Sequence, residues 1–296
     1  MVQGIATWQV TWSSSGALQE LIAKARVLVE ALPYILQFRG KTIVVKIGGA
    51  SLEDEVLRRR FCEDLILLDW VGVNVVVVHG GGKQISSMLA RLGVEATFDR
   101  GQRVTDAATL EVVEMVLSGS INADLVRQIN HLGGSAVGLS GCDGSLARAV
   151  ITRPELGRVG EIDHVNRCVI DRLINDFIPV IAPLASGPDG LALNVNADVF
   201  ATRLATAIGA EKLVLLTDVA GVLDENKQLI STLTTQRARD LIAAGVINGG
   251  MIPKVEHALA TVAKGVPKVH IIDGREEHAL LLEVFTTEGI GTQVVP

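Results

Sequence analysis

Two lysines stand beside glycines in distant parts of the sequence. Lys46 lies in Thr42–Leu52 (TIVVKIGGASL), an otherwise apolar, β-branched run, and Lys254 ends the segment Gly249–Lys254 (GGMIPK) at the start of a predicted helix. A lysine in a buried strand is costly unless a negative charge meets it near the end of that strand. The alternative for Lys46 is a side chain that reaches solvent at the sheet edge. Together the two lysines predict a site where two positive charges from distant parts of the chain bind one transferring phosphoryl group.

Glycines follow two of the predicted strands. The run Val75–Val78 has no alternation of apolar and polar residues, which is typical of a strand buried on both faces of a parallel sheet. Gly48 and Gly49 follow the Lys46 strand, and Gly80 follows Val75–Val78; these three are the phosphate-binding candidates. Gly81 and Gly82 come directly after Gly80. Bare N–H groups and a helix N-terminus at such a turn favour a bound anion. The alternative is a tight strand-to-helix turn without a ligand.

Further polar residues precede two predicted helices. Arg103 lies in Gly101–Asp106 (GQRVTD), before a helix that Asp106 can cap. Its guanidinium is a candidate carboxylate clamp, and a solvated surface arginine is the alternative. Asn194 and Asp198 lie in NVNAD, where the asparagine can bond an amide in both directions and the carboxylate suits a first helical turn. A helix cap plus a turn asparagine would explain the same residues.

Several common motifs are missing. The sequence has no GxxxxGK[ST], GxGxxG, GxSxG or HExxH, so ordinary P-loop, dinucleotide, hydrolase and zinc-protease interpretations lose their main support. His79 abuts the triple glycine, but no paired carboxylate or serine motif accompanies it. We therefore favour a histidine that packs in the turn.

The elements that position these residues follow a strand-helix-strand rhythm, which predicts a doubly wound α/β fold. The predicted strands are the Lys46 run, Val73–Val78, part of Gly133–Gly144, Arg158–Val165 as a hairpin strand, Ile178–Ala185, Lys212–Thr217 and Lys268–Ile272. The predicted helices are Glu53–Trp70, one after Gly82, one after Asp106, Val199–Ile208, Ala238–Ala244 and one at Lys254. No dense carboxylate cluster is visible, so no metal-ligating residues are assigned.

The N-terminal part differs from the rest. Ala17–Phe38 carries apolar residues at spacings of three and four, which predicts an amphipathic helix that Pro33 should kink or divide. Met1–Ser15 has no helical period, and we expect it to be mobile; its Trp8 and Trp12 are large apolar groups that can dock on another surface.

Composition limits the possible partners and compartment. A 296-residue chain that is 48% hydrophobic can bury a large core, and a net charge of −6 argues against general binding to nucleic acid or anionic membranes. An aromatic content of 3% argues against stacking platforms for bases. The three scattered cysteines without a CxxC predict reduced thiols, and with no membrane-length run and no signal pattern we expect a cytoplasmic protein.

The motifs taken together resemble the amino acid kinase family. They are, in chain order, KIGG, HGGG, GQRVTD, GLSGCDG, NVNAD, LLTDVAGVL, GGMIPK and HIIDG, and the match extends from about Lys41 to Thr292. Each piece is weak, whereas the combination is specific. The resemblance implies a three-layer αβα sandwich with a mostly parallel central sheet. It also implies an acceptor-binding and dimerisation lobe at residues 41–183 and a nucleotide-binding lobe at 184–296, with residues 1–40 as an N-terminal extension.

The resemblance implies ATP-dependent, Mg²⁺-assisted phosphorylation of the side-chain carboxylate of N-acetyl-L-glutamate, a step of arginine biosynthesis. Lys46 and Lys254 would stabilise the phosphoryl group and Asp198 would orient them. The implied acceptor-binding residues are Gly81, Gly82, Arg103 and Asn194. The implied nucleotide-binding residues are Asp218, Gly221, Leu223, Asn248 and Gly249.

Family members with an extra N-terminal helix resemble ring-like hexamers inhibited by arginine, so the resemblance implies a homo-oligomer, built from dimers, with an arginine site. The residues at matching effector positions are Lys212, His278, Glu288 and Gly291. A PII-type signalling protein is a further implied partner. The alternatives are a kinase for N-acetyl-aminoadipate or a carrier-linked acceptor, and an amino-acid sensor that has lost turnover, although Lys46, Asp198 and Lys254 argue against the sensor.

Overall fold

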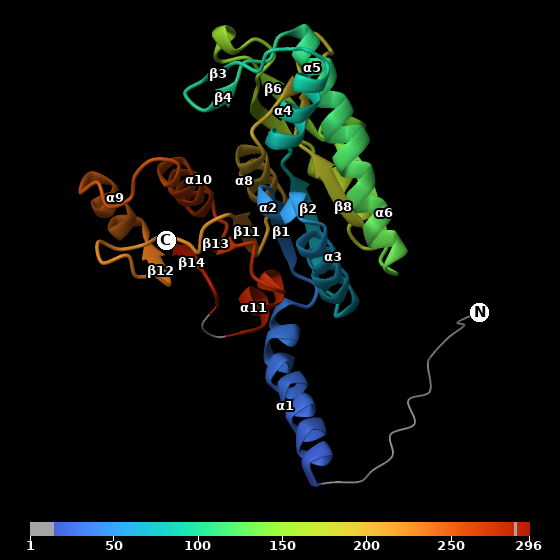
Figure 1. Ribbon diagram of the computed structural model, residues 1–296, viewed down its shortest axis with the longest axis vertical. Coiled ribbons are helices and arrows are strands. Elements are labelled where there is room, and N and C mark those ends of the chain that lie inside the picture. Colours follow the sequence, from blue (N-terminus) through green and yellow to red (C-terminus); the bar gives the residue numbers. More distant parts are fainter. Residues whose placement is uncertain (1–14, 287–288) are drawn as a thin grey trace.

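An eight-stranded sheet forms the centre of the computed structural model, which describes residues 15–286 and 289–296 (Figure 1). Its strands, in spatial order, are β12 (Thr232–Thr234), β14 (Thr292–Val295), β13 (Lys268–Asp273), β11 (Lys212–Thr217), β1 (Thr42–Ile47), β2 (Asn74–His79), β8 (Ile178–Ala182) and β5 (Ala136–Ser140). Neighbouring strands are parallel except β13 and β14, which pair antiparallel. The predicted α/β class and the mostly parallel sheet are therefore confirmed.

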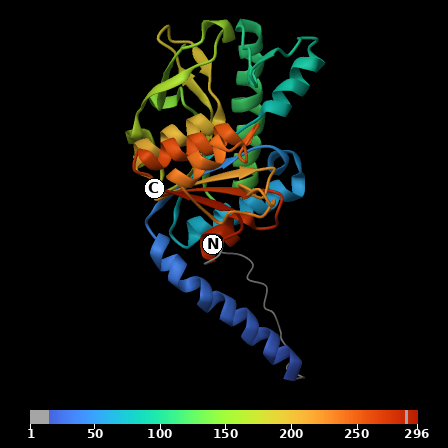
Figure 2. The same ribbon diagram turned by 90° about the vertical axis from the view of Figure 1, so that its left-hand side faces the viewer.

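A smaller sheet and a hairpin lie at the far end of the molecule from α1 (Figures 1 and 2). The smaller sheet contains, in order, β10 (Ala192–Asn194), β9 (Leu184–Ser186), β6 (Ala147–Val150) and β7 (Glu161–Val165), and the hairpin pairs β3 (Phe98–Asp99) with β4 (Gln102–Arg103). The run Ile178–Ala185, which we predicted as one strand, is divided at Pro183 between the two sheets.

Helices cover both faces of the central sheet. In chain order, the helices of the described residues are α1 (Ser15–Phe38), α2 (Ala50–Glu53), α3 (Glu55–Trp70), α4 (Gly82–Arg91), α5 (Ala107–Glu114), α6 (Ala123–His131), α7 (Arg167–Leu173), α8 (Ala197–Ile208), α9 (Thr235–Ala243), α10 (Met251–Ala263) and α11 (Ala279–Phe285). A π-helical segment, Met115–Asn122, joins α5 to α6, and 3₁₀ turns occupy Asp143–Ser145 and Pro154–Leu156. None of these helices is long and apolar enough to cross a membrane, within the residues described.

Two hydrophobic cores, one on each face of the sheet, explain the continuous apolar runs. Val45 and Val77 pack in the core that α3, α5, α6 and α11 cover, whereas Val44 and Val76 pack in the core beneath α8 and α10. All four valines are fully buried. Since successive side chains of a strand point to opposite faces, a sheet covered on both faces needs apolar residues at every position.

Two predicted helices differ in detail. The helix expected over Glu53–Trp70 is interrupted at Asp54, whose carboxylate accepts hydrogen bonds from the N–H groups of Val56 and Leu57 at 2.8 and 3.0 Å and so caps α3. The N-terminal helix continues through Pro33 and is not divided there.

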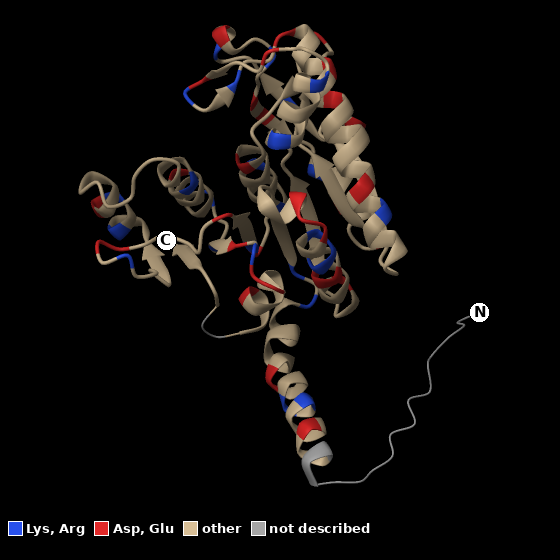
Figure 3. Ribbon diagram, viewed as in Figure 1, with Lys and Arg blue, Asp and Glu red and all other residues tan. Residues whose placement is uncertain are grey.

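α1 projects from the body of the molecule and contacts it near α11 (Figures 1 and 2). The helix carries acidic and basic residues along its length (Figure 3), and it exposes apolar side chains such as Leu28 (74%) and Val29 (68%). Trp8 and Trp12 lie outside the described residues. The central sheet takes strands from both sides of the predicted lobe boundary at residues 183 and 184, so that boundary stays a prediction.

Candidate active site

Asp198 lies between the two lysines that the sequence singles out. Its Oδ1 is 2.9 Å from Nζ of Lys46, and its Oδ2 is 3.6 Å from Nζ of Lys254. Burial alone would raise the pKa of the Asp198 carboxyl, but the two lysine charges and the Lys46 hydrogen bond lower that pKa to about 2. The aspartate is therefore ionised at every working pH, and one positive charge of the trio remains uncompensated.

The fold brings this trio together from three elements. Lys46 lies near the carboxyl end of β1, and Lys254 lies in the first turns of α10. Asp198 lies in the first turn of α8, which Asn196 caps by accepting hydrogen bonds from the N–H groups of Asp198 and Val199 at 2.9 and 3.2 Å. The positive ends of two helix dipoles thus point at the site where the lysines meet.

The triple-glycine turn joins β2 to α4. A Cβ on Gly81 would come within 2.6 Å of the Ile121 side chain and 2.7 Å of the Leu117 side chain, so a larger residue there would have to displace both. Gly82 begins α4, and Gly80, Gly81 and Gly82 line a cavity of about 510 Å³. The turn therefore presents backbone N–H groups and a helix N-terminus to this cavity.

His79 packs behind the turn, as the sequence suggests. Its side chain is fully buried, and burial lowers the pKa of the imidazole to about 4. A neutral ring fits the contacts, because Nδ1 lies 3.0 Å from the Gly80 carbonyl and Nε2 lies 3.2 Å from the amide nitrogen of Asn122. Asn122 also donates to the Val180 carbonyl at 2.8 Å. Sequence reasoning missed Asn122, which fastens the turn to β8.

Arg103 lies at the edge of the same cavity and is 8% exposed. Its Nη2 donates to the Gly82 carbonyl at 2.8 Å and to Ser86 Oγ at 2.7 Å, and the guanidinium lies 4.7 Å from the centre of the Phe98 ring. Its buried Nη1 has no hydrogen-bond partner within the described residues. This arrangement leaves a donor for a carboxylate ligand.

Asn194 ends β10 and lines the same cavity as the glycine turn. Its amide donates to Thr105 Oγ1 at 3.2 Å, and Thr105 Oγ1 donates to the carbonyl of Arg103 at 3.1 Å. Thr105, which is fully buried, therefore connects the two residues predicted to bind the acceptor, a role that sequence reasoning missed. Ala197 and His257 also line the cavity, which thereby reaches the helices of Asp198 and Lys254.

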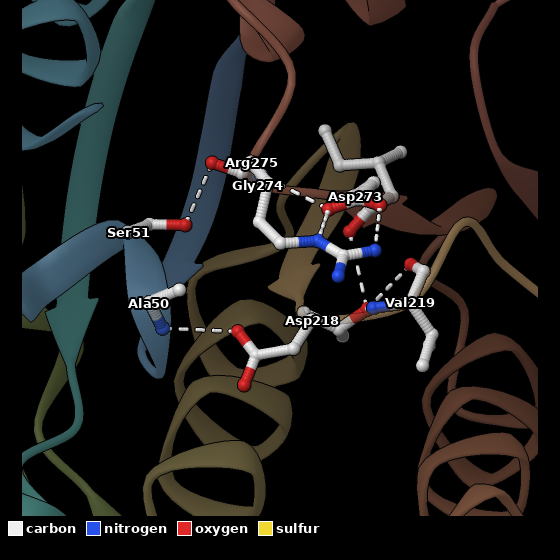
Figure 4. A network of polar contacts seen from close by, with 9 residues as sticks. Ala50, Ser51, Asp218, Val219, Asp273, Gly274 and Arg275 are labelled. Atoms are coloured by element: carbon white, nitrogen blue, oxygen red, sulfur yellow. Dashed lines mark hydrogen bonds and ion pairs between the residues drawn. The ribbon is translucent and has the colours of Figure 1, made fainter. Parts of the chain in front are cut away.

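The second glycine turn, Gly48 and Gly49, joins β1 to α2. Gly49 has φ +60°, and a Cβ there would collide with the carboxylate of Asp218. Asp218 Oδ1 accepts a hydrogen bond from the Ala50 N–H at 3.0 Å, and Ser51 Oγ donates to the Gly274 carbonyl at 2.8 Å (Figure 4). The turn is thus fastened to the loops that follow β11 and β13.

The predicted nucleotide-binding residues lie on the β11 side of the sheet. Asp218, Gly221 and Leu223 follow β11, while Asn248 and Gly249 come immediately before α10. Gly221 has φ +147° and packs against Thr292, whose Oγ1 accepts from the Val222 N–H at 2.8 Å.

A separate cavity of about 240 Å³ lies where the end of α1 meets β11, β13 and α11. Lys212 and Gly291, two of the residues that the resemblance assigns to an effector site, line this cavity, and the assignment stays a prediction. His278 does not belong to its lining: its Nδ1 lies 2.6 Å from Oδ1 of buried Asp64. Glu288 lies outside the described residues.

Sequence reasoning missed three side chains of this cavity, those of Phe38, His270 and Glu283. Lys212 Nζ lies 5.0 Å from the centre of the Phe38 ring, and burial lowers the pKa of this lysine to about 8. Glu283 pairs with His270, and both side chains are almost completely buried. Glu283 also accepts from the Ile290 N–H at 3.1 Å. One carboxylate near the lysine therefore faces the cavity that α1 borders.

Comparison with known proteins finds relatives of this chain both in sequence and in fold. The family model described as "Amino acid kinase family" matches residues 41–273. The acetylglutamate kinase of Aquifex aeolicus is 52% identical over 94% of this chain and 99% of its own length, and that of Thermoanaerobacter pseudethanolicus is 51% identical over 92% and 93%. The solved N-acetylglutamate synthase of Neisseria gonorrhoeae, complexed with coenzyme A and N-acetyl-glutamate, superposes with a TM-score of 0.81 at 27% identity, covering 92% of this chain and 63% of that one.

The chain belongs to the amino acid kinase family. Within that family it groups with the acetylglutamate kinases, which makes it a phosphotransferase of arginine biosynthesis. The carbamate kinase of Giardia lamblia bound to AMP-PNP shares the fold, with a TM-score of 0.62 at 16% identity over 86% of this chain and 98% of that one.

Proposed function

We propose that the protein transfers the γ-phosphoryl group of ATP to the side-chain carboxylate of N-acetyl-L-glutamate. The observation that carries this proposal is the Lys46–Asp198–Lys254 trio beside a cavity lined by glycine N–H groups and a buried arginine. The identity of about 50% to acetylglutamate kinases over more than nine-tenths of the chain supports the choice of acceptor.

The acceptor would lie in the 510 Å³ cavity. The free Nη1 of Arg103 suits the main-chain carboxylate of the amino acid, since a guanidinium binds a carboxylate through parallel hydrogen bonds. Asn194 can bond the acetamido group, because its amide both donates and accepts. The side-chain carboxylate would then meet the N–H groups of Gly81 and Gly82 at the start of α4.

The reaction needs little proton transfer. A glutamate side chain with an ordinary pKa of about 4.3 is already ionised at neutral pH, so no general base is required. A carboxylate oxygen attacks the γ-phosphorus while the bond from that phosphorus to the bridging oxygen breaks and ADP leaves. Lys46 and Lys254 would neutralise the charge on the transferring group, and Asp198, which pairs with both ammonium groups, would hold them in place.

ATP and Mg²⁺ complete the proposal. In this proposal Asp218, Gly221, Leu223, Asn248 and Gly249 would line the nucleotide site, and Gly48, Gly49 and Gly80 would contact its phosphates. Within the described residues, no three His, Cys, Asp or Glu side chains converge on one point. A Mg²⁺ ion bound here would therefore take most of its ligands from phosphate and water, and would supply charge neutralisation on the phosphates.

The decisive experiment traps the product. Purified protein with Mg-ATP, N-acetyl-L-glutamate and hydroxylamine should give a hydroxamate. N-acetyl-aminoadipate, one methylene longer, should give far less. A hydroxamate only with N-acetyl-aminoadipate or with a carrier-linked acceptor would assign the acceptor to those alternatives, and no hydroxamate with any acceptor would leave the amino-acid sensor.

The second cavity supports feedback inhibition by arginine. Glu283 can pair with a guanidinium and Lys212 with a carboxylate, and α1 borders the same cavity, so a bound amino acid would contact the N-terminal helix. The Neisseria gonorrhoeae synthase complexed with coenzyme A and L-arginine superposes with a TM-score of 0.78 at 27% identity, covering 92% of this chain and 65% of that one.

The exposed apolar side chains of α1 support an oligomer, because residues such as Val27, Leu28 and Val29 would be costly to leave in water. A second copy of the helix is the occupant we propose. The cysteines Cys62, Cys142 and Cys168 are free, which supports the reducing cytoplasm as the compartment.

A further inference from the structure

A second polar pair follows the Asp198–Lys254 ion pair along the same two helices. Thr202 comes four residues after Asp198 on α8, and His257 comes three residues after Lys254 on α10. Residues at these spacings share one face of a helix. Since α8 and α10 contact each other and the ion pair joins their first turns, Thr202 and His257 lie one turn deeper along the same contact.

Both side chains carry a buried polar atom without a partner. Thr202 is 5% exposed, and neither its Oγ1 nor Nδ1 of His257 makes a hydrogen bond to any residue that the structure describes. Both residues line the acceptor cavity. Leaving two buried polar atoms unpaired is unfavourable, so each atom needs a hydrogen-bond partner, which the two can share.

Neighbouring threonines show that this is not the usual behaviour of a helical hydroxyl. Thr206 Oγ1 donates to the Thr202 carbonyl at 2.8 Å, and Thr261 Oγ1 donates to the His257 carbonyl at 2.6 Å. Thr202 has the same option, the carbonyl of Asp198 four residues before it, and does not use it. Its hydroxyl is therefore free to bond across the helix contact.

We propose that Thr202 and His257 are positioning residues that join α8 to α10 through one bridging water molecule, and that this link fixes Lys254 relative to Asp198. A hydroxyl both donates and accepts, and Nδ1 accepts in the tautomer with the proton on Nε2, so a water can bond both groups. The proposal rests on the phosphoryl transfer proposed above, for which Lys254 must be held in place.

The geometry of the ion pairs shows why such a link matters. The Lys254–Asp198 separation of 3.6 Å is longer than the Lys46–Asp198 separation of 2.9 Å. The flexible stem of a lysine does not fix its ammonium group, so the distance from Lys254 to Asp198 depends on how far it must reach and thus on how α10 is held against α8. A shift of α10 against α8 would move Lys254 from the phosphoryl group, and small misplacements of a catalytic group slow the chemical step. Arg103 and the glycine turn would be unaffected.

Matched variants test the link. Thr202→Val removes the hydroxyl at constant shape, whereas Thr202→Ser keeps it. His257→Gln places its amide near the Nε2 position, whereas His257→Asn places it near Nδ1. We expect the Val and Gln variants to lose roughly tenfold in kcat with an acceptor KM within about twofold of wild type, and Ser and Asn to retain kcat. The double variant Thr202→Val/His257→Gln should be no slower than the slower single variant.

Unfolding measurements give a readout that does not need the substrate. The losses of unfolding free energy in the same cycle should also be less than additive, and a crystal structure should show one water bonded to both side chains. The proposal would be overturned by additive effects in the double variant. It would also be overturned if Thr202→Ser lost as much kcat as Thr202→Val, or His257→Asn as much as His257→Gln. A raised acceptor KM at unchanged kcat would contradict it as well. If no acceptor is phosphorylated by wild type, the proposed function fails, and the unfolding cycle still decides whether the link exists.

Discussion

Lys46 and Asp198 come from different halves of the chain, and their Nζ and Oδ1 atoms lie 2.9 Å apart. Lys254 reaches the other oxygen of the same carboxylate. A single aspartate between two ammonium groups leaves one net positive charge, in a place that solvent reaches poorly and where a charge acts more strongly than in water. The trio is therefore arranged to receive an anion, and the attraction of the Asp198 carboxylate for both ammonium groups offsets the repulsion between them.

Loss of either lysine should affect the chemical step. Lys46→Ala and Lys254→Ala should each lower kcat by roughly 10²-fold or more, because a preorganised charge acts most strongly on the transition state. Steady-state kinetics with saturating ATP and acceptor measure this effect. Lys83→Ala is a matched control, since that lysine is 69% exposed in a surface ion pair with Glu53 beside the glycine turn. A variant of Lys46 or Lys254 with near-normal kcat would remove that lysine from the mechanism.

Arg103 should govern acceptor affinity. In Arg103→Lys the planar fork is lost, so we expect the KM for N-acetyl-L-glutamate to rise by roughly tenfold or more while the KM for ATP changes little. Circular dichroism should show an intact fold, which separates lost binding from lost structure. An unchanged acceptor KM would mean that the unpaired Nη1 is not used for the acceptor.

The sequence was informative where a strand or helix had a strong period and a charged residue stood in an unusual place. Val75–Val78 and Lys46 are examples, because burial on both faces leaves a direct pattern, and the strand, the turn and a largely buried lysine paired with a carboxylate are all found in the structure. Thr105 could not be predicted, since its role depends on the approach of Asn194 from another sheet. Asn122 could not be predicted for the same reason, because it connects the π-helical segment to His79 and to β8, which are distant in the sequence.

The two histidines near the C-terminus show a further limit. Matching by position selected His278, but its ring pairs with Asp64, a buried residue of α3. His270 lies on β13 with its side chain toward the 240 Å³ cavity beside α1, next to Glu283. In a strand buried on both faces, apolar patterning does not tell which side of the sheet a polar residue faces. Only the packing of α11 on β13 decides it.

His79 should make stability depend on pH. Its pKa is about 4 in the folded protein, below the ordinary value of about 6.5 in the unfolded chain, so between these values the unfolded chain binds more protons and stability falls as pH falls. Above about pH 6.5 the contribution of the neutral ring is fully present, and near pH 4 about 3 kcal/mol of it should be lost.

Urea unfolding of wild type and His79→Gln between pH 4 and pH 7.5 measures this contribution. Other groups titrate equally in both proteins, so their contributions cancel when the two curves are subtracted. The difference in unfolding free energy between wild type and His79→Gln should therefore shrink toward pH 4. His131→Gln, at an exposed position in the last turn of α6, is the control and should leave the slope unchanged. Parallel curves for wild type and His79→Gln would show that burial of this ring does not control the pH dependence.

The last prediction concerns arginine and the N-terminal helix. If α1 both closes the effector cavity and joins subunits, removing it should abolish inhibition and reduce the mass in solution together, while the acceptor cavity and the lysine trio stay intact. A truncated protein beginning at Arg39 should therefore keep the basal kcat, ignore millimolar arginine and form a smaller species than the intact chain. Activity titrations with arginine and light scattering measure the two effects.

Controls separate the two roles of the helix. Leu28→Glu changes a side chain that is 74% exposed and far along α1 from Phe38, so it should reduce the mass in solution without removing any residue of the cavity. Glu283→Gln should weaken inhibition without changing the mass, because the carboxylate faces the cavity rather than solvent. Should the intact enzyme be a dimer that ignores arginine, both the effector site and the larger ring are wrong. Should truncation leave the mass unchanged, the exposed apolar residues of α1 do not join subunits.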